Sequence, residues 1–286
     1  MSEDGARIGS PSRGGPVQDA GRIADYELVD PLADGGHGRF HLAVPPARLG
    51  LDVDRVVVKV VAGGDDTAFR RFTRELKLFA RVAHPNLVRL YDAGQHEDRF
   101  FYSMEWCPGG SLEDPAALDR SGRIRAVAQA ARAAHALHES GIVHRDIRPG
   151  NVLVRADGSA ALADLGLAQL GSSSMTSMAP MASIGFVDPE LLRGGSAGRP
   201  TDVYALAATL HRVLTAQDVF AGLDPADPML AVRTVLRRPP TVRRDLLDDD
   251  VAAIIEACLD VAVEARPPTA EALADLLDGC SGGTEP

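Results

Sequence analysis

The chain has few cysteines and no long apolar run. Only 3 cysteines occur in 286 residues, Cys107, Cys258 and Cys280, and their spacing matches no metal-ligand motif. An odd number of unpatterned cysteines favours free thiols in a reducing compartment, so we expect a cytoplasmic protein. No segment approaches the roughly 20 apolar residues that a membrane-spanning helix needs, and no signal-peptide core is visible. We therefore expect no membrane segment.

The chain also lacks a run of basic residues. It has 30 Lys and Arg against 40 Asp and Glu, which gives a net charge of −10. This balance argues against nucleic acid or an acidic membrane surface as the main partner. The length allows two lobes, and the composition is that of a globular protein. Because residues 1–24 are rich in Gly, Ser, Pro and Arg, we expect a disordered leader there, and a polar tail at residues 281–286.

Two loops rich in Asp and Asn carry the most information. Residues 144–151 read His-Arg-Asp-Ile-Arg-Pro-Gly-Asn, and Asp-Leu-Gly follows at 164–166. Phosphoryl transfer needs a carboxylate that orients the attacking hydroxyl and oxygen ligands for Mg²⁺. Asp146 suits the first task, and Asn151 and Asp164 suit the second. The alternative interpretation is a pair of Asx-rich turns that follow apolar strands.

These two loops resemble the catalytic and metal-binding loops of protein kinases. The resemblance implies that Asp146 is the catalytic carboxylate, that Arg148 holds the γ-phosphate, and that Asn151 and Asp164 bind Mg²⁺, with Mn²⁺ as an alternative metal. Ser/Thr kinases usually have Lys where Arg148 stands, which leaves a Tyr acceptor open. Ser183 retains the hydroxyl that Ser/Thr kinases place beside the catalytic Asp, so we favour a Ser/Thr acceptor.

A glycine-rich stretch at residues 32–40 resembles the loop that covers the ATP phosphates in this family. Glycines let backbone N–H groups approach an anion closely. The stretch departs from the family pattern at Ala33, where the first glycine usually stands, and three glycines can also form an ordinary hairpin turn. The residues that the resemblance assigns to ATP binding are Leu32, Gly35, Gly36, Gly38, Phe40, Val57, Lys59, Glu105, Cys107 and Leu153.

Lys59 lies in the Val-rich run 56–61. A lone Lys is costly to bury in an apolar strand unless it reaches water or meets anions. The run resembles the family's strand whose Lys contacts the α- and β-phosphates and pairs with a helix Glu, so Lys59 counts among the catalytic residues. Glu75 lies beside the apolar face of the predicted helix Asp65–Ala83, and we expect it to pair with Lys59. The alternative is a surface partner of a neighbouring helix residue.

The C-terminal half contains two further matches. Ser183–Glu190 resembles the end of a kinase activation segment, and the resemblance implies that Glu190 pairs with a distant Arg, for which Arg266 is the candidate. The segment that starts at Thr201 resembles the family's central buried helix. There Asp202 would accept backbone N–H groups of the catalytic loop.

The segment between the two matches has the composition of a mobile loop. Residues 171–178 hold five hydroxyl side chains and no Tyr. Since Arg145 precedes Asp146, a phosphate on this loop would have a cation to bind. The pattern favours regulation by autophosphorylation, with transient self-association of the protein. A solvated flexible loop without such a role is the alternative.

Hydrophobic periodicity predicts a β-rich half followed by a helical half. Short strands are expected at 26–61, Leu87–Tyr91 and Phe100–Glu105, and helices at Asp65–Ala83, Arg123–Ser140, Asp202–Thr215, Val251–Leu259 and Ala270–Leu277. We therefore predict an α+β, bilobal, protein-kinase-like fold. Its small β-rich N-lobe with one helix would span 25–105, and its larger helical C-lobe would span 106–280.

The resemblance implies transfer of the ATP γ-phosphate to Ser or Thr hydroxyls of protein substrates. Two other functions stay open. A pseudokinase that binds nucleotide with little turnover is compatible with Ala33 and Arg148. A small-molecule kinase of the aminoglycoside or choline type shares the spacing of Asp146 and Asn151, but it lacks the motif of Arg145.

Overall fold

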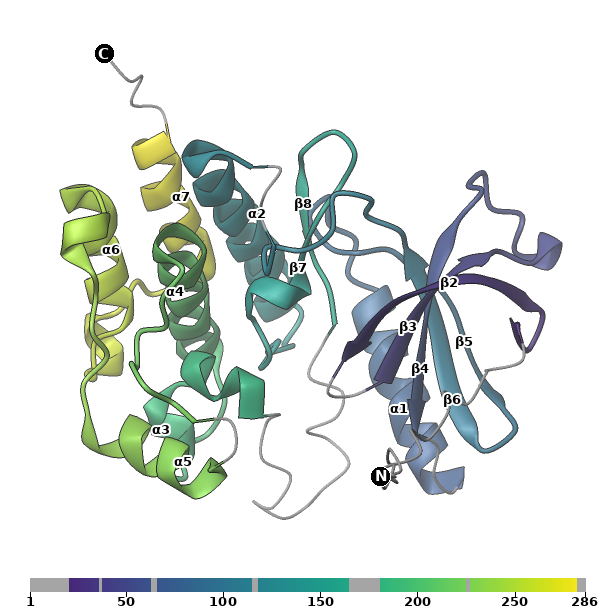
Figure 1. The fold of residues 1–286 in the computed structure, drawn as a ribbon, viewed down its shortest axis with the longest axis horizontal. Helices are drawn as coiled ribbons and strands as arrows, with labels where there is room; N and C mark the ends of the chain where they lie inside the picture. The colour runs from purple at the N-terminus through teal and green to yellow at the C-terminus, as the bar shows by residue number, and fades with distance from the viewer. Residues whose placement is uncertain are drawn as a thin grey trace, which may run out of the picture.

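The computed structural model describes residues 21–35, 38–62, 66–114, 118–164, 181–224 and 227–281. These residues form two lobes, one dominated by a β-sheet and one by helices (Figure 1). No helix in this part of the chain is both long and apolar enough to cross a lipid bilayer. Residues 1–20 and 282–286 of the predicted leader and tail lie outside the described residues, and Arg22–Ile23 form a short strand.

The N-terminal lobe is an antiparallel sheet covered by one helix. Its strand order is β1-β2-β3-β4-β6-β5. The strands are β1 Arg22–Ile23, β2 Tyr26–Gly35, β3 Gly38–Val44, β4 Val56–Ala62, β5 Leu90–His96 and β6 Arg99–Glu105, and the helix is α1 Asp66–Ala80. Phe72 and Leu76 of α1 pack on Tyr102 of β6, which fixes the helix on one face of the sheet (Figure 1).

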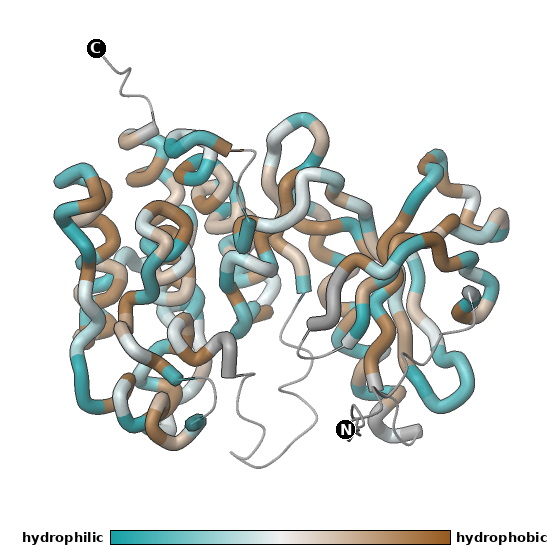
Figure 2. Tube along the Cα trace, in the orientation of Figure 1, coloured by the Kyte–Doolittle hydropathy of each residue, from teal (hydrophilic) through white to brown (hydrophobic). Residues whose placement is uncertain are grey.

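The C-terminal lobe is built around two buried helices. Its helices are α2 Arg120–Glu139, α3 Pro189–Leu192, α4 Arg199–Thr215, α5 Pro228–Arg237, α6 Asp249–Cys258 and α7 Ala270–Ser281, and β7 Val152–Val154 pairs with β8 Ala160–Leu162. α4 packs against α2, α6 and α7 and is buried almost all round. Figure 2 shows apolar and polar residues alternating along the outer helices, as expected where one face of a helix is buried.

Local capping decides where the helices begin and end. The predicted helix 123–140 begins earlier, because the Asp119 side chain accepts from the Gly122 N–H at 2.7 Å and caps the first turn. Its predicted end at Gly141 is confirmed: this glycine has a φ of 74° and donates to His138 O at 3.0 Å. α1 ends before Ala83, because the chain tightens into a turn in which Val82 N bonds Phe79 O. α5 was missed, although Asp227 and Pro228 are ordinary helix-start residues.

The stability of the fold is expected to fall in mild acid, and His211 contributes to this. Its Nδ1 lies 2.9 Å from Gln217 O, and its Nε2 accepts from Arg243 N at 3.1 Å, so the folded protein holds a neutral ring. Burial lowers the pKa of His211 below its ordinary value. The unfolded chain therefore binds a proton at a higher pH than the folded one, and stability is lost as the pH falls through the unfolded pKa.

Urea unfolding at about pH 7.5 and about pH 5.5 measures this loss. His211→Gln should show a smaller loss than wild type between these two conditions. His84 and His144, whose pKa values are also lowered by burial, contribute to the remaining loss. An identical pH dependence in variant and wild type would contradict the role of His211.

Candidate active site

The loop that carries Asp146 is held in shape by Asp202 of α4. The Asp202 carboxylate accepts the backbone N–H groups of His144 at 2.8 Å and Arg145 at 2.9 Å. His138 Nε2 of α2 lies 2.7 Å from the same carboxylate. These contacts hold Arg145 in the left-handed region, with a φ of 69°, a conformation that a residue with a Cβ adopts only under constraint. The role predicted for Asp202 is confirmed.

Three predicted site residues meet on this loop. The Asn151 side-chain Nδ2 donates to Asp146 O at 2.7 Å and to Asp146 Oδ2 at 2.9 Å. Arg148 Nε lies 3.7 Å from Asp146 Oδ1. This Nε is buried and has no hydrogen-bond partner among the described residues, so the site contains a donor without an acceptor. A buried donor of this kind suits an anion.

Asp164 lies at the end of β8, where a carboxylate, an ammonium and a phenol meet. Lys59 of β4 contacts Asp164 Oδ2, and the Tyr102 hydroxyl of β6 donates to Asp164 Oδ1. The Asp164 backbone is left-handed, with a φ of 62°. The preceding residue, Ala163, donates its N–H to Asn151 O at 2.8 Å, and this bond joins the segment of Asp164 to the loop that carries Asp146.

The two carboxylates differ in their electrostatics. Burial raises the pKa of Asp146 above its usual value, although the Arg148 guanidinium opposes this. Burial also pushes the pKa of Asp164 upward, but the charge of Lys59 and the hydrogen bonds from Lys59 and Tyr102 outweigh it and leave the pKa lowered. Asp164 is therefore anionic at neutral pH, while Asp146 is the more basic carboxylate.

The predicted ion pair between Lys59 and Glu75 is absent from the described residues. Lys59 points to Asp164 instead and lies over the ring of Phe40, 4.9 Å from its centroid. Burial raises the pKa of Glu75, and the charges that act on it are those of Arg71, Arg145 and Arg74. In the folded protein the Lys59 ammonium therefore contacts the Asp164 carboxylate and not that of Glu75. A catalytic role for Glu75 stays a prediction.

The residues predicted to hold the nucleotide gather only in part. Val57 and Cys107 belong to one apolar cluster, with Phe40 and Leu153 packed against it. Burial in this cluster raises the pKa of the Cys107 thiol to about 12. The Glu105 side chain is bound elsewhere, because both of its oxygens accept from Arg155, at 2.6 and 3.2 Å.

The glycine-rich stretch forms the end of the β2–β3 hairpin. Gly38 has a φ of 145°, and a Cβ there would lie 2.5 Å from Val60 O, so only glycine fits. Gly35 pairs with Gly38 across the hairpin, and Leu32 is exposed. Gly36 lies outside the described residues, as do the side chain of Ser183 and the hydroxyl-rich residues 171–178.

The predicted pair of Glu190 and Arg266 is wrong, because Asp188 takes the place of Glu190. Arg266 donates to Asp188 through two nitrogens, at 2.5 and 3.2 Å, and both side chains are almost fully buried. Asp188 also accepts the Glu190 N–H at 3.0 Å and so caps α3. Glu190 follows on the first turn of α3, where its side chain is 46 % exposed and lies 3.8 Å from Arg193.

Sequence reasoning missed two residues of the site. Tyr102 sits directly opposite Lys59 in the β4–β6 ladder, and a polar aromatic residue in an apolar strand was a signal that could have identified it. Arg155, which binds Glu105, follows β7 and had no such signal, because its partner lies 50 positions away in the chain.

A β-lobe with one helix, a helical lobe and a loop that carries Asp146 and Asn151 together define a protein-kinase-like molecule. Residues 35–276 match the family model of the protein kinase domain. The chain therefore belongs to the protein kinase family, and the predicted family and bilobal fold are confirmed.

Three proteins with sequences similar to this chain are bacterial serine/threonine-protein kinases. PknB of Mycobacterium leprae is 32 % identical over 271 residues, which cover 90 % of this chain and 43 % of the relative. PknJ of Mycobacterium tuberculosis is 33 % identical over 233 residues, 77 % of this chain and 39 % of the relative. The DNA damage-responsive kinase RqkA of Deinococcus radiodurans is 33 % identical over 265 residues, 88 % of this chain and 39 % of the relative. The chain thus spans less than half the length of these relatives.

Proposed function

We propose that this chain transfers the γ-phosphate of ATP to Ser and Thr hydroxyls of protein substrates. The proposal depends on the contacts that join two loops. Asn151 bonds both Asp146 and the segment of Asp164, and the Asp202 carboxylate binds the backbone of the loop that carries Asp146. The relatives that bear the name serine/threonine-protein kinase support the same chemistry.

Each residue of the site has a task in this reaction. Asp146 orients the acceptor hydroxyl and takes its proton, and its raised pKa makes it a better base than an exposed Asp. The Nε of Arg148, which has no hydrogen-bond acceptor among the described residues, holds the charge of the transferred phosphoryl group. Lys59 moves from Asp164 to the α- and β-phosphates of the nucleotide. The apolar cluster of Val57 and Leu153 takes the adenine ring.

Asn151 and Asp164 are the residues that fit a divalent cation. Asn151 uses Nδ2 to bond Asp146, which leaves its Oδ1 as a ligand, and Asp164 is anionic. Both are hard oxygen donors, which suits Mg²⁺ or Mn²⁺. No three His, Cys, Asp or Glu side chains of the described residues form a metal cage, in line with a cation that is held by few protein ligands and by phosphates. Such a cation neutralises the charge of the triphosphate.

Autophosphorylation belongs to the proposal as well. Arg145 stands beside Asp146 and would bind a phosphate on the hydroxyl-rich residues 171–178 after transfer between two copies of the chain. We also place the protein in the cytoplasm, which the free cysteines support.

One incubation tests the function. Wild-type protein with γ-labelled ATP, Mg²⁺ and a basic acceptor protein should yield labelled phosphoserine and phosphothreonine. The label should be lost when EDTA replaces Mg²⁺, and in Lys59→Met. Label in phosphotyrosine alone would contradict the Ser/Thr assignment, and nucleotide binding without any transfer would indicate a nucleotide-binding scaffold instead.

A further inference from the structure

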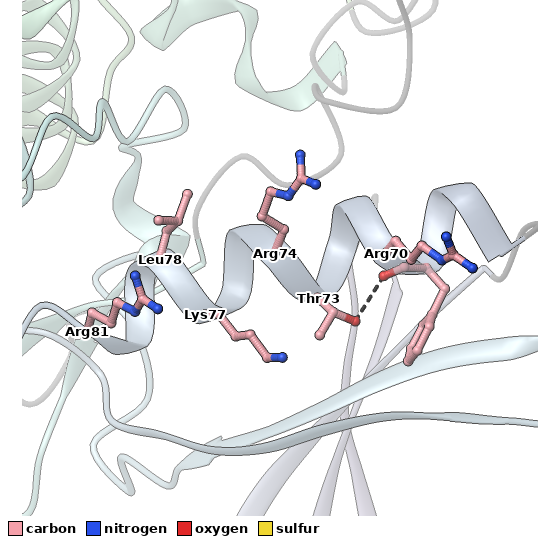
Figure 3. A pocket seen from close by; sticks show the side chains of 7 residues that line it. Arg70, Thr73, Arg74, Lys77, Leu78 and Arg81 are labelled. Atoms are coloured by element: carbon pink, nitrogen blue, oxygen red, sulfur yellow. Dashed lines mark hydrogen bonds between the residues drawn. The ribbon is translucent and has the colours of Figure 1, made fainter.

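The outward face of α1 is strongly basic, although the whole chain carries a net charge of −10. We define the α1 basic face as Arg70, Arg74 and Lys77 of α1 together with Arg81, which directly follows the helix; all four are exposed. Figure 3 shows these cations along the helix, where they line a shallow hollow of about 370 Å³ together with Phe69, Thr73 and Leu78.

The cations of the α1 basic face form no close ion pair within the part of the chain that the structure describes. None of the four makes an ion pair or a side-chain hydrogen bond with any residue that the structure describes. Arg132 is a contrast, because it contacts three carboxylates of α7. Like charges at positions i, i+4 and i+7 of a helix repel one another. This face therefore carries an electrostatic cost that an anionic partner would remove.

An apolar contact lies among these charges. Leu78 is 44 % exposed on α1. Phe69 packs against Phe100, 5.2 Å between ring centroids, and the Thr73 hydroxyl bonds Phe69 O at 2.9 Å, so the floor of the hollow is ordered (Figure 3). The α1 basic face thus combines cations with the exposed Leu78 side chain above an ordered floor.

We propose that the α1 basic face docks an acidic segment of a partner protein, with one apolar residue of that segment against Leu78. From Arg70 to Lys77 the helix rises about 10 Å, and Arg81 follows in the turn after α1 ends at Ala80. An extended chain covers this length in about four residues, and its alternate side chains point to the same side. A short Asp/Glu-rich strand therefore places every second side chain against the cations of this face.

A protein segment fits better than a nucleic acid or a membrane. The basic face is short, and a chain with a net charge of −10 repels extended polyanions beyond it. The docking site lies on the outer surface of the N-terminal lobe, and the proposal goes beyond phosphoryl transfer and does not depend on it.

Fluorescence anisotropy with a labelled peptide tests the proposal on the full chain. The probe is a short Glu/Asp peptide with one central Leu, and its control replaces each acid by Gln or Asn. Wild type should bind the acidic probe, and the double variant Arg70→Glu/Lys77→Glu should weaken Kd about tenfold or more. The matched control is Arg233→Glu/Arg237→Glu, which makes the same charge change at exposed residues of α5 that form no ion pair with any described residue. It should change Kd less than about twofold.

Four outcomes would overturn the proposal. They are the absence of binding to wild type, equal binding of the neutral peptide, equal weakening by the two double variants, and tighter binding of phosphatidylserine vesicles or oligouridine than of the peptide. Thermal unfolding of both variants shows that the fold is intact. Because the readout is binding, the result is independent of whether the chain transfers phosphate.

Discussion

Asp146→Asn is expected to lower the rate of phosphate transfer by about 10²- to 10⁴-fold while ATP binding stays close to that of wild type. The side chain keeps its size and its contact with Asn151, but it can no longer take the proton of the acceptor hydroxyl. Phosphate incorporation into an acceptor protein measures the first effect, and isothermal titration with ATP measures the second.

A matched variant and a pH profile sharpen this test. Asp157→Asn makes the same change in the exposed β7–β8 turn, where the side chain only bonds Ser159, and it should leave the rate unchanged. Because burial raises the pKa of Asp146, wild-type activity should fall with decreasing pH at a higher pH than about 4, the range of an exposed Asp. Comparable rates in Asp146→Asn and wild type would remove Asp146 from its role.

Arg266→Ala is expected to reduce the free energy of unfolding by about 3–5 kcal/mol. The change leaves the Asp188 carboxylate buried without its partner. It also removes the Arg266 bonds to Asp260 O at 2.8 Å and Pro200 O at 3.1 Å, and the packing of the guanidinium on the Tyr204 ring. Activity should fall only as a consequence of unfolding. Urea denaturation gives the loss directly.

Glu190→Gln is the matched control, because it tests the carboxylate that the sequence favoured. Its contact with Arg193 is 3.8 Å long and partly exposed, and such pairs contribute about 0–1 kcal/mol. A loss as large as that of Arg266→Ala would contradict the buried Asp188–Arg266 pair.

The pair of Asp188 and Arg266 shows the limit of motif reasoning. The motif placed an acid near position 190 and a distant Arg at 266, but two acids lie two positions apart. Asp188 begins α3 and caps it, so its carboxylate turns inward, while Glu190 lies on the outer side of the first turn. Backbone conformation decided which acid was buried, and spacing carries no information on that.

Lys59 gives the same lesson for the active site. The Val-rich strand left two possibilities for its ammonium, water or an anion, and the structure buries Lys59 beside a carboxylate. The choice of anion did not follow. Glu75 and Asp164 are both within the family pattern, and the one that contacts Lys59 depends on how α1 and β8 pack against the sheet. Tyr102, which bonds Asp164 from the opposite strand, takes part in that choice.

The sequence alone predicts the family, the two-lobe plan and the loop that carries Asp146, because short motifs and hydrophobic periodicity determine them. It also predicts that α2 ends before Gly141, because a turn residue stands there. These depend on neighbours within a few positions. Partnerships such as Asp188 with Arg266, Lys59 with Asp164 and Arg155 with Glu105 join residues at least 50 positions apart. They arise when packed lobes bring charges together in a buried, low-dielectric setting, where the nearest opposite charge prevails.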